Sequence, residues 1–380
     1  MNMANLNELR GNPALAKLEL LVKGVEMQND LRLNEEEAEE KYFYDSAKRG
    51  EGILPSEIIL PQGIVSNIFV SEKSPYFIQD RKLFLNGGKV FDIRFTPEAK
   101  FSKEILSDGM PASRVAVMYG LDVFSLFLNR KCSYFKNNLG CEFCSLDYTS
   151  KNKGKKNPFN PKVSQVVETF RKALEMDRPL FNYVLVSSGA YADPDKGIIE
   201  QMKYIKAMKD IDDGKIKYHL VTIPPKSDEL LHRLSEGVDS VAFDLEIFDA
   251  DLFRKYCPGK EKQIAYGSWL KIFEKSSRYF KKGSVKIGFV CGLEPLDSLV
   301  EGMEFVGNLG LTPAVNIFHP DEGTPLADSP RPSLGYVMNL VREQSRIYRQ
   351  NKLVPVFPEY GRRSSLDTEV YKGFFNGIRN

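Results

Sequence analysis

The sequence predicts an α/β fold, a full or partial (β/α) barrel preceded by a smaller N-terminal α+β domain. Three observations lead to this prediction. Apolar strand-like segments alternate with amphipathic helical segments from about residue 115 onward, and repeated βα units favour a parallel sheet with right-handed crossovers. Six or seven such units follow one another, which suits a barrel better than a short open sheet. The region before them carries β-hairpin signals instead.

Residues 1–114 are expected to form the accessory domain. A helix is predicted to begin near Leu15 and to stop at Gly24, and the acidic run 35–40 is expected to lead a second helix. Two β runs flank Asn86-Gly87, a dipeptide typical of a tight hairpin turn. Further strands of this domain are predicted at 57–60, 63–70 and 76–79.

The barrel itself is predicted over residues 115–330, and a closing helix, strand and tail over 331–380. Ser227 and Ser333 are candidate N-caps, which supports two of the helix starts. The barrel strands are expected at 123–129, 183–187, 217–223, 240–247, 285–292, 312–318 and 353–357. The helices are expected at 163–175, 197–209, 227–235, 263–280, 296–309 and 333–351. The active site of such a barrel lies at the carboxyl ends of its strands.

The composition, 42% hydrophobic and 27% charged, is that of an ordinary folded, soluble protein. A formal net charge of +2 gives no overall electrostatic case for nucleic acid or a membrane surface. No apolar run approaches the roughly 20 residues of a membrane helix, and the start of the sequence lacks a signal-peptide pattern. Five clustered rather than dispersed cysteines fit a reducing compartment. We therefore expect a cytoplasmic protein.

Three cysteines, Cys132, Cys141 and Cys144, mark the expected site of chemistry in the first βα loop. Their C-x8-C-x2-C spacing leaves three interpretations open. A structural zinc site needs four ligands, and the fourth would have to be Cys257 or Cys291, because no histidine is nearby. A disulfide with spare thiols is the second. A [4Fe–4S] cluster held by three thiolates, with one iron open to another ligand, fits best.

On these cysteines the chain resembles the radical S-adenosylmethionine superfamily, and its later motifs resemble the biotin-synthase-like and Elongator-like branches. The resemblance implies a partial (β/α)6-type TIM barrel whose open iron binds S-adenosylmethionine. It also implies reductive cleavage to a 5′-deoxyadenosyl radical that takes hydrogen from a substrate. The usual family spacing is C-x3-C-x2-C, so the first gap here is longer. Phe143 occupies the aromatic position that the family prefers before the last cysteine.

The resemblance extends to the ends of the second and fourth strands. Ser188 and Gly189 stand where the family has a Gly-rich turn against the amino group of S-adenosylmethionine, although the acidic residue of that turn is missing. An ordinary βα turn is the alternative. Strand alternation places Asp244 and Glu246 on one face, where carboxylates accept hydrogen bonds from ribose hydroxyls. The resemblance implies Glu246 as the ribose or methionine contact and Asp244 as the second; structural carboxylates are the alternative.

The remaining implied contacts follow further along the chain. In the segment Arg254-Lys-Tyr-Cys-Pro-Gly-Lys260, either Arg254 or Lys260 is implied as the partner of the methionine carboxylate, with surface charge as the alternative. Cys257 is expected to be a packed thiol, and Cys291 to face the helices. The residues implied as adenosine contacts are Val290 and Gly292 of the fifth strand and Asn316 and Phe318 of the sixth.

The sequence says less about the substrate than about the cofactors. Arg362 and Arg363 are candidates for a carboxylate or phosphate clamp, with a solvent-facing pair as the alternative. A second cysteine group and a cobalamin signature are absent from the sequence. We therefore favour a small-molecule biosynthetic substrate, a flavodoxin or ferredoxin as electron donor, and no nucleic-acid partner. The alternatives are tRNA modification, with residues 57–114 and 151–156 gripping RNA, and a zinc-stabilised binding protein.

Overall fold

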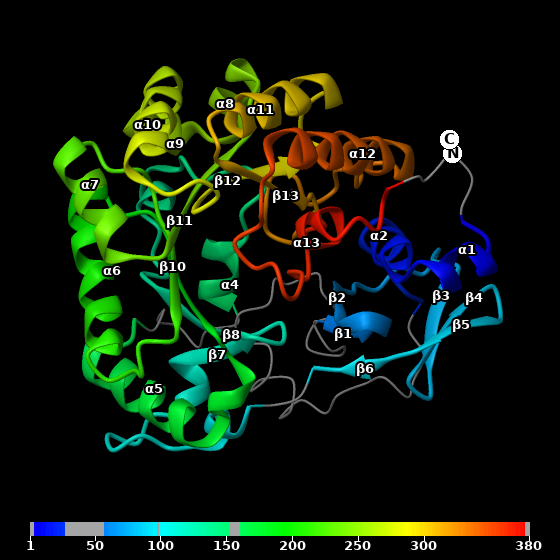
Figure 1. The fold of residues 1–380 in the computed structure, drawn as a ribbon, viewed down its shortest axis with the longest axis horizontal. Helices are drawn as coiled ribbons and strands as arrows, with labels where there is room; N and C mark the ends of the chain where they lie inside the picture. The colour runs from blue at the N-terminus through cyan, green and yellow to red at the C-terminus, as the bar shows by residue number, and fades with distance from the viewer. Residues whose placement is uncertain (1–3, 27–56, 97–98, 153–159, 377–380) are drawn as a thin grey trace.

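The fold is an α/β barrel that stays open on one side (Figure 1). The computed structural model describes residues 4–26, 57–96, 99–152 and 160–376 of the chain. A seven-stranded sheet has the order β13-β12-β11-β10-β9-β8-β7, in which only β7 pairs antiparallel with its neighbour. The predicted partial barrel of six parallel strands is thereby confirmed. The strands are β7 (Ala116–Tyr119), β8 (Val123–Leu128), β9 (Tyr183–Ser188), β10 (Lys217–Val221), β11 (Ser240–Glu246), β12 (Val285–Cys291) and β13 (Thr312–Ile317).

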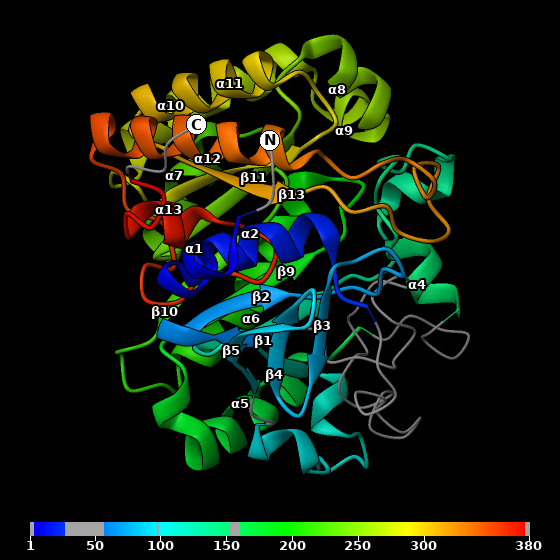
Figure 2. The same ribbon diagram turned by 90° about the vertical axis from the view of Figure 1, so that its right-hand side faces the viewer.

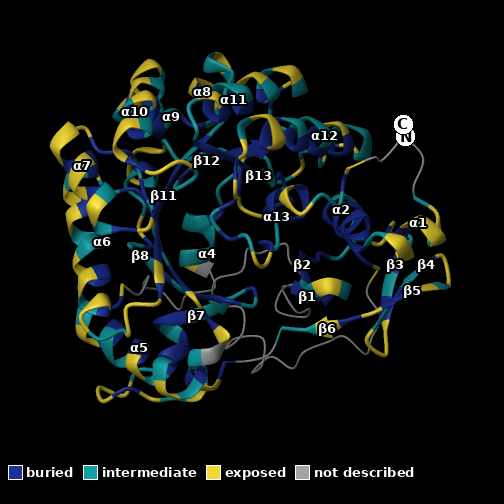
Figure 3. Ribbon diagram, in the orientation of Figure 1, coloured by how far each residue is buried: buried dark blue, intermediate teal, exposed yellow. Residues whose placement is uncertain are grey.

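Helices cover the outer surface of this sheet, with exposed outward faces and buried inward ones (Figure 3). Ser227 and Ser333 cap their helices as predicted, because their side chains accept the backbone N–H of Leu230 and Tyr336. Two short helices after β11 were not predicted. The barrel helices are α4 (Leu146–Asn152), α5 (Val163–Asp177), α6 (Pro194–Lys209), α7 (Asp228–Gly237), α8 (Ala250–Tyr256), α9 (Pro258–Gln263), α10 (Tyr266–Tyr279), α11 (Leu296–Asn308), α12 (Leu334–Asn351) and α13 (Asp367–Tyr371).

The predicted strand at 353–357 is wrong. Pro355 lies within it and Pro358 follows it, and proline has no N–H to donate to a sheet. The chain instead runs as an irregular stretch, residues 353–366, which we call the closing segment. Its Ser364 carbonyl accepts the Ile317 N–H of the edge strand β13 at 3.1 Å.

The other end of the closing segment reaches the opposite edge of the open barrel. Arg362 forms an ion pair of 2.6 Å with Asp122, in the turn between β7 and β8. The guanidinium also donates to the carbonyl oxygens of Tyr119 and Tyr360. The closing segment therefore spans the gap between the last and the first strands, where no strand of the described part of the chain pairs across.

The N-terminal part holds two helices and two small antiparallel sheets beside the barrel (Figure 2). The predicted hairpin is confirmed: Asn86 and Gly87 have φ of 48° and 82°, the left-handed values of a type I′ turn. The predicted second helix at 35–40 lies outside the described residues. The elements are α1 (Leu6–Gly11), α2 (Pro13–Lys23), β1 (Glu57–Leu60), β2 (Ile64–Asn67), β3 (Tyr76–Gln79), β4 (Lys82–Leu85), β5 (Gly88–Asp92) and β6 (Arg94–Phe95).

This N-terminal part packs directly on the closing segment. The buried ammonium of Lys17 lies 2.9 Å from a carboxylate oxygen of Glu369 and donates to the Arg362 carbonyl at 2.9 Å. The backbone N–H of Asn67 donates to the Arg363 carbonyl at 2.8 Å. Apolar residues of both parts belong to one continuous core cluster. Across the described ranges, no helix has the length and apolar character needed to cross a bilayer.

Candidate active site

Two adjoining cavities lie in the barrel, one at the carboxyl ends of the strands and one further inside. The first, of about 530 Å³, we call the cysteine cavity, because Cys132, Cys141 and Cys144 line it. The second, of about 380 Å³, we call the inner cavity. The predicted residues in the cysteine cavity are Phe143, Ser188, Gly189, Asp244, Glu246, Lys260 and Arg363. Those in the inner cavity are Phe143, Asp244, Glu246, Val290, Asn316, Phe318 and Arg362.

The long gap between the first two cysteines forms an ordered turn. The 3-10 helix Ser133–Asn137 starts directly after Cys132, and Asn138 ends it with a left-handed φ of 54°. The Leu139 N–H donates to the Tyr134 carbonyl at 3.0 Å. A Cβ on Gly140 would lie 2.3 Å from the ring of Phe135, so this ring packs against bare backbone. The cysteine loop is thus built as a compact unit.

The Cys-Pro-Gly-Lys segment supports this turn from the side. The Gly259 N–H donates to the Leu139 carbonyl at 3.0 Å. A Cβ on Gly259 would lie 2.5 Å from that carbonyl oxygen and 2.5 Å from Cγ of Tyr134, so only glycine allows the approach. One turn earlier, the Tyr256 carbonyl accepts the Glu142 N–H at 2.9 Å. Two segments that are far apart in the sequence therefore fix the position of Cys141.

The end of β9 holds the other side of the cysteine loop. The Ala190 carbonyl accepts the Ser133 N–H at 2.8 Å, and the Asn129 carbonyl accepts the Gly189 N–H at 3.1 Å. The Asn129 amide donates back to the Gly189 carbonyl at 3.0 Å. A Cβ on Gly189 would lie 2.8 Å from the Cβ of Cys132. This glycine is therefore needed where the two loops meet.

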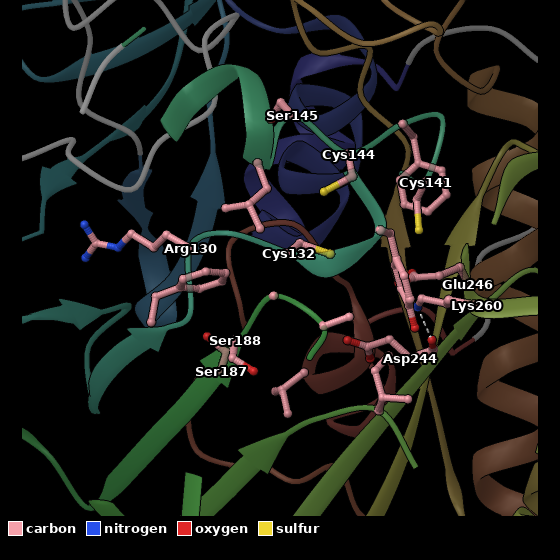
Figure 4. A pocket seen from close by; sticks show the side chains of 18 of the residues that line it. Arg130, Cys132, Cys141, Cys144, Ser145, Ser187, Ser188, Asp244, Glu246 and Lys260 are labelled. Atoms are coloured by element: carbon pink, nitrogen blue, oxygen red, sulfur yellow. Dashed lines mark hydrogen bonds and ion pairs between the residues drawn. The ribbon is translucent and has the colours of Figure 1, made fainter. Parts of the chain in front are cut away.

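The three thiols lie around one cavity. Within the described residues, no group of three or more His, Cys, Asp or Glu side chains converges on a single ion position. In a [4Fe–4S] cluster each cysteine binds a different iron, so thiols that lie around one cavity are compatible with this group. All five cysteines of the chain are free, and Figure 4 shows Cys132, Cys141 and Cys144 around one opening.

The local environment affects these thiols differently. Burial raises the pKa of Cys132 and Cys144, so their thiolates need the positive charge that bound iron supplies. A hydrogen bond with the Cys257 thiol lowers the pKa of Cys141. Cys257 is fully buried, in agreement with the prediction of a packed thiol. Cys291 is also fully buried and lines neither cavity, as expected for the helix side of β12.

The two predicted carboxylates flank a bulge at the end of β11. The register to β12 shifts between Asp244 and Glu246, and Glu246 has a left-handed φ of 76°. The Lys260 ammonium lies 2.8 Å from Glu246 and also donates to the Asp244 carbonyl (Figure 4). Burial raises the pKa of Glu246, and the charge of Lys260 opposes this shift. Lys260 and Glu246, which the resemblance assigned to separate ligand contacts, thus pair with each other in this structure.

Asp244 is the carboxylate left for a ligand. Its Oδ1 atom is buried and has no hydrogen-bond partner among the described residues. The side chain packs over Gly288, where a Cβ would lie 2.0 Å from Oδ1. Buried polar atoms are nearly always paired in native proteins. We therefore expect Asp244 to accept a hydrogen bond from a bound molecule.

Four residues of the implied contacts lie away from the cysteine cavity. Gly292 lines neither cavity; its φ of 104° and its packing on Pro332, at 2.9 Å from an added Cβ, explain why glycine stands there. Asn316 and Phe318 face the inner cavity instead of the cysteine cavity. Arg254, half exposed, pairs with Asp251 at 2.6 Å on the surface. The adenosine contacts implied for Gly292, Asn316 and Phe318 stay predictions.

The first member of the predicted arginine clamp already has a protein partner. Arg362 is committed to the ion pair with Asp122, and its guanidinium lies 4.4 Å from the ring centroid of Phe357. Arg363 lines the cysteine cavity, with its guanidinium 5.4 Å from the Tyr119 ring centroid. Both arginines line a cavity, so the alternative of a solvent-facing pair is not what the structure shows.

Several residues of the cavities were not predicted. Asp321 accepts a hydrogen bond from Ser145 at 2.8 Å and lies 2.9 Å from His319 at the rim. His219 and Lys286 line the inner cavity. The signal for the first group was a polar His-Pro-Asp run directly after the sixth strand. The signal for the second was a histidine in the middle of β10 and a single lysine in the otherwise apolar β12.

A partial (β/α) barrel with three cysteines at the carboxyl ends of its strands is an architecture that can hold an iron–sulfur cofactor at the mouth of the barrel. Residues 137–306 match the family model of the radical SAM superfamily. The cofactors of this superfamily are a [4Fe–4S] cluster and S-adenosylmethionine. Its members act on a substrate and need a reductant. The match includes Cys141 and Cys144 and begins after Cys132.

Individual relatives are distant. The bacteriochlorophyllide c C-7(1)-hydroxylase of Chlorobaculum limnaeum is 22% identical over 258 residues, which are 64% of this chain and 64% of the relative. The FeFe-hydrogenase maturase of Carboxydothermus hydrogenoformans is 15% identical, with a TM-score of 0.46 over 67% of this chain and 55% of the maturase. A radical SAM methyltransferase from Sphaerobacter thermophilus is 17% identical, with a TM-score of 0.44 over 65% of this chain and 69% of the methyltransferase.

Proposed function

We propose that this enzyme binds its cluster through Cys132, Cys141 and Cys144 and acts on a small biosynthetic molecule. One observation carries the proposal. The three thiols share a single cavity with the carboxyl ends of β9 and β11. When bound there, the cluster and S-adenosylmethionine supply reductive cleavage to a 5′-deoxyadenosyl radical, which takes a hydrogen atom from the substrate.

The side chains and backbone of the cavity then have distinct roles. Ser188 and Gly189 present backbone at the end of β9, beside Cys132. Asp244 offers an unpaired carboxylate oxygen to ribose hydroxyls. The Lys260–Glu246 pair holds the bulge of β11 in place and so positions Asp244. Phe143 lies at the boundary of both cavities and shields the reacting region from water.

A small molecule fits the barrel better than tRNA. The inner cavity lies within the barrel and holds about 380 Å³, the size of a small-ligand site. In the basic stretch 151–156, Lys151 pairs with Asp147 at 2.6 Å, and residues 153–156 lie outside the described ranges. The hydroxylase relative is named for a small-molecule substrate as well. The electron is supplied, in this proposal, by a flavodoxin or ferredoxin.

Anaerobic reconstitution tests the proposal. We expect about four irons per chain and brown absorbance, and release of 5′-deoxyadenosine when dithionite and S-adenosylmethionine are added. Cys132→Ala, Cys141→Ala and Cys144→Ala should each lose the cluster and this product. Cys291→Ala is the matched control, because that thiol is buried away from both cavities. A colourless wild-type protein with one zinc, or normal iron in the cysteine variants, would overturn the assignment.

A further inference from the structure

The inner cavity continues the cysteine cavity into the barrel. Phe143, Val221, Asp244 and Glu246 line both cavities, so the two adjoin at this level. Below it the inner cavity is walled by β10, β12, β13 and the closing segment. A molecule that enters past the cysteine cavity would place one end near the cluster site and its other end deep in the barrel.

Most charged groups of the inner cavity are already neutralised. Glu246 pairs with Lys260 at 2.8 Å, and Arg362 pairs with Asp122 at 2.6 Å. His319 lies 2.9 Å from a carboxylate oxygen of Asp321. These pairs leave two charged side chains in the lining, Asp244 near the cysteine cavity and Lys286.

Lys286 makes no close contact with a protein anion. No hydrogen bond joins it to another described residue, and no described carboxylate lies within 4.0 Å of it. At longer range its charge opposes the rise in pKa that burial causes at Asp367 and Glu246. It is the second residue of β12 and shares the inward face with Gly288 and Val290. About 13 Å of strand separates it from Val290. Lys286 therefore lies at the deep end of the inner cavity.

A second unpaired polar group faces the same space. His219 on β10 is only 1% exposed, and its Nε2 atom has no partner among the described residues. Its Nδ1 atom lies 2.8 Å from the Ser240 hydroxyl, which fixes the ring. The imidazole also contacts the Phe357 ring edge to face, with ring centroids 5.3 Å apart. A buried nitrogen that is fixed in place but unpaired needs a ligand to complete its hydrogen bonding.

The rest of the lining is mixed. Leu185, Phe318, Phe357 and Tyr119 supply apolar and aromatic surface, whereas Asn316, Ser364 and Ser365 add neutral polar groups. Apolar rings beside one ammonium and one imidazole suit a molecule with a partly apolar body and one acidic end. Lys286 is half-buried, and no described carboxylate lies within 4.0 Å of it, so its ammonium is available to a bound anion.

From these observations we propose that the inner cavity is the substrate pocket and that it binds an organic acid. Its carboxylate or phosphate oxygens accept hydrogen bonds from Lys286, and the adjacent polar atom of the acid end meets His219. The apolar body then extends upward toward Phe143 and the cysteine cavity. This inference rests on the proposed function for the place of radical formation, whereas binding of the acid requires neither the cluster nor S-adenosylmethionine.

Ligand-observed ¹⁹F NMR with 4-fluorobenzoate tests the pocket, and 4-fluorobenzamide serves as the neutral isostere. The full chain is used, both before and after cluster loading. Hydrogen bonds to charged groups contribute about 1.5–3 kcal/mol, so the acid should bind at least about tenfold more tightly than the amide. Lys286→Met should remove this preference. Lys286→Arg should keep most of it, which separates loss of charge from loss of folding.

The matched control is Lys271→Met, which changes an exposed lysine on α10 and should bind both probes as the wild type does. Equal binding of acid and amide, no binding of the acid at any soluble concentration, or an unchanged acid preference in Lys286→Met would each overturn the inference. Failure of the proposed function shows separately, as wild-type protein without iron and without 5′-deoxyadenosine. Phenyl phosphate in competition then shows whether the pocket prefers a phosphate to a carboxylate.

Discussion

Replacing Gly189 by alanine should loosen the cluster without removing any of its ligands. An added Cβ would lie 2.8 Å from the Asn129 carbonyl oxygen, 2.8 Å from the Cys132 Cβ and 2.9 Å from the Cys132 Cα. Ordinary contacts begin at 3.4 Å, so the cysteine loop has to retreat by about 0.6 Å, the difference between 3.4 and 2.8 Å. Two of these three atoms are backbone, and no change of rotamer relieves them.

A shift of this size exceeds the tolerance of roughly 0.5 Å that a site usually allows. We expect a loss of stability of about 1–3 kcal/mol, typical of overpacking. We also expect at least about tenfold faster loss of iron, as for changes next to metal ligands. The assay loads the variant with iron anaerobically and follows the visible absorbance after addition of an iron chelator.

Gly267→Ala is the control for this experiment. Gly267 lies on an exposed part of α10, and an added Cβ there would meet no atom within 4 Å. The control should retain iron as the wild type does and gain slightly in stability, because alanine favours a helix. If Gly189→Ala releases iron at the wild-type rate, the close approach of β9 to Cys132 does not position the cluster loop.

Three further predictions concern buried charges. Lys260→Met should destabilise the protein by about 3–5 kcal/mol, because Glu246 is left buried without its partner. In urea unfolding, the double variant with Glu246→Gln should recover most of this loss. Additive losses from the two substitutions would contradict an energetic coupling between Lys260 and Glu246. Burial lowers the pKa of His219 well below 6.5, so protonation favours the unfolded chain and stability falls below pH 6.5. Between about pH 7.5 and about pH 5.5, the free energy of unfolding of the wild type should therefore fall by about 1.4 kcal/mol more than that of His219→Gln. An equal pH dependence of the unfolding free energy in both proteins would refute this. Arg362→Met should lower the free energy of unfolding by about 3 kcal/mol, measured by thermal unfolding, because Asp122 is left buried without its ion-pair partner. A decrease below about 1 kcal/mol would show that the pair contributes little to stability.

The sequence predicted the barrel well because its strands and helices differ in hydrophobic period. The six parallel strands and the helices after them are local patterns, with caps such as Ser227. The segment after α12 was mispredicted because its apolar residues resemble a strand, while Pro355 and Pro358 prevent sheet pairing. Strand β7 was missed because only its pairing with β8 assigns it to the barrel sheet.

The structure brings the three predicted cysteines together. Cys132, Cys141 and Cys144 line one cavity, as their spacing led us to expect, and their role as cluster ligands stays a prediction. The ion pair of Lys260 with Glu246 joins residues that the sequence had assigned to two different ligand contacts, and only the bulge at β11 brings them together. Lys286 was missed because a single lysine in an apolar strand carries no motif, and its importance depends on the partners that it lacks.

The closing segment divides the barrel between two kinds of wall. The thiols and Asp244 sit at the ends of hydrogen-bonded strands, where a change in length disturbs the sheet. Residues 357, 362, 364 and 365 line the inner cavity from an irregular segment outside the strand ladder. Directed evolution of this enzyme toward new substrates should therefore begin at the small residues Ser364 and Ser365, where the pocket can be reshaped while the Arg362–Asp122 pair and the cofactor half of the barrel stay intact.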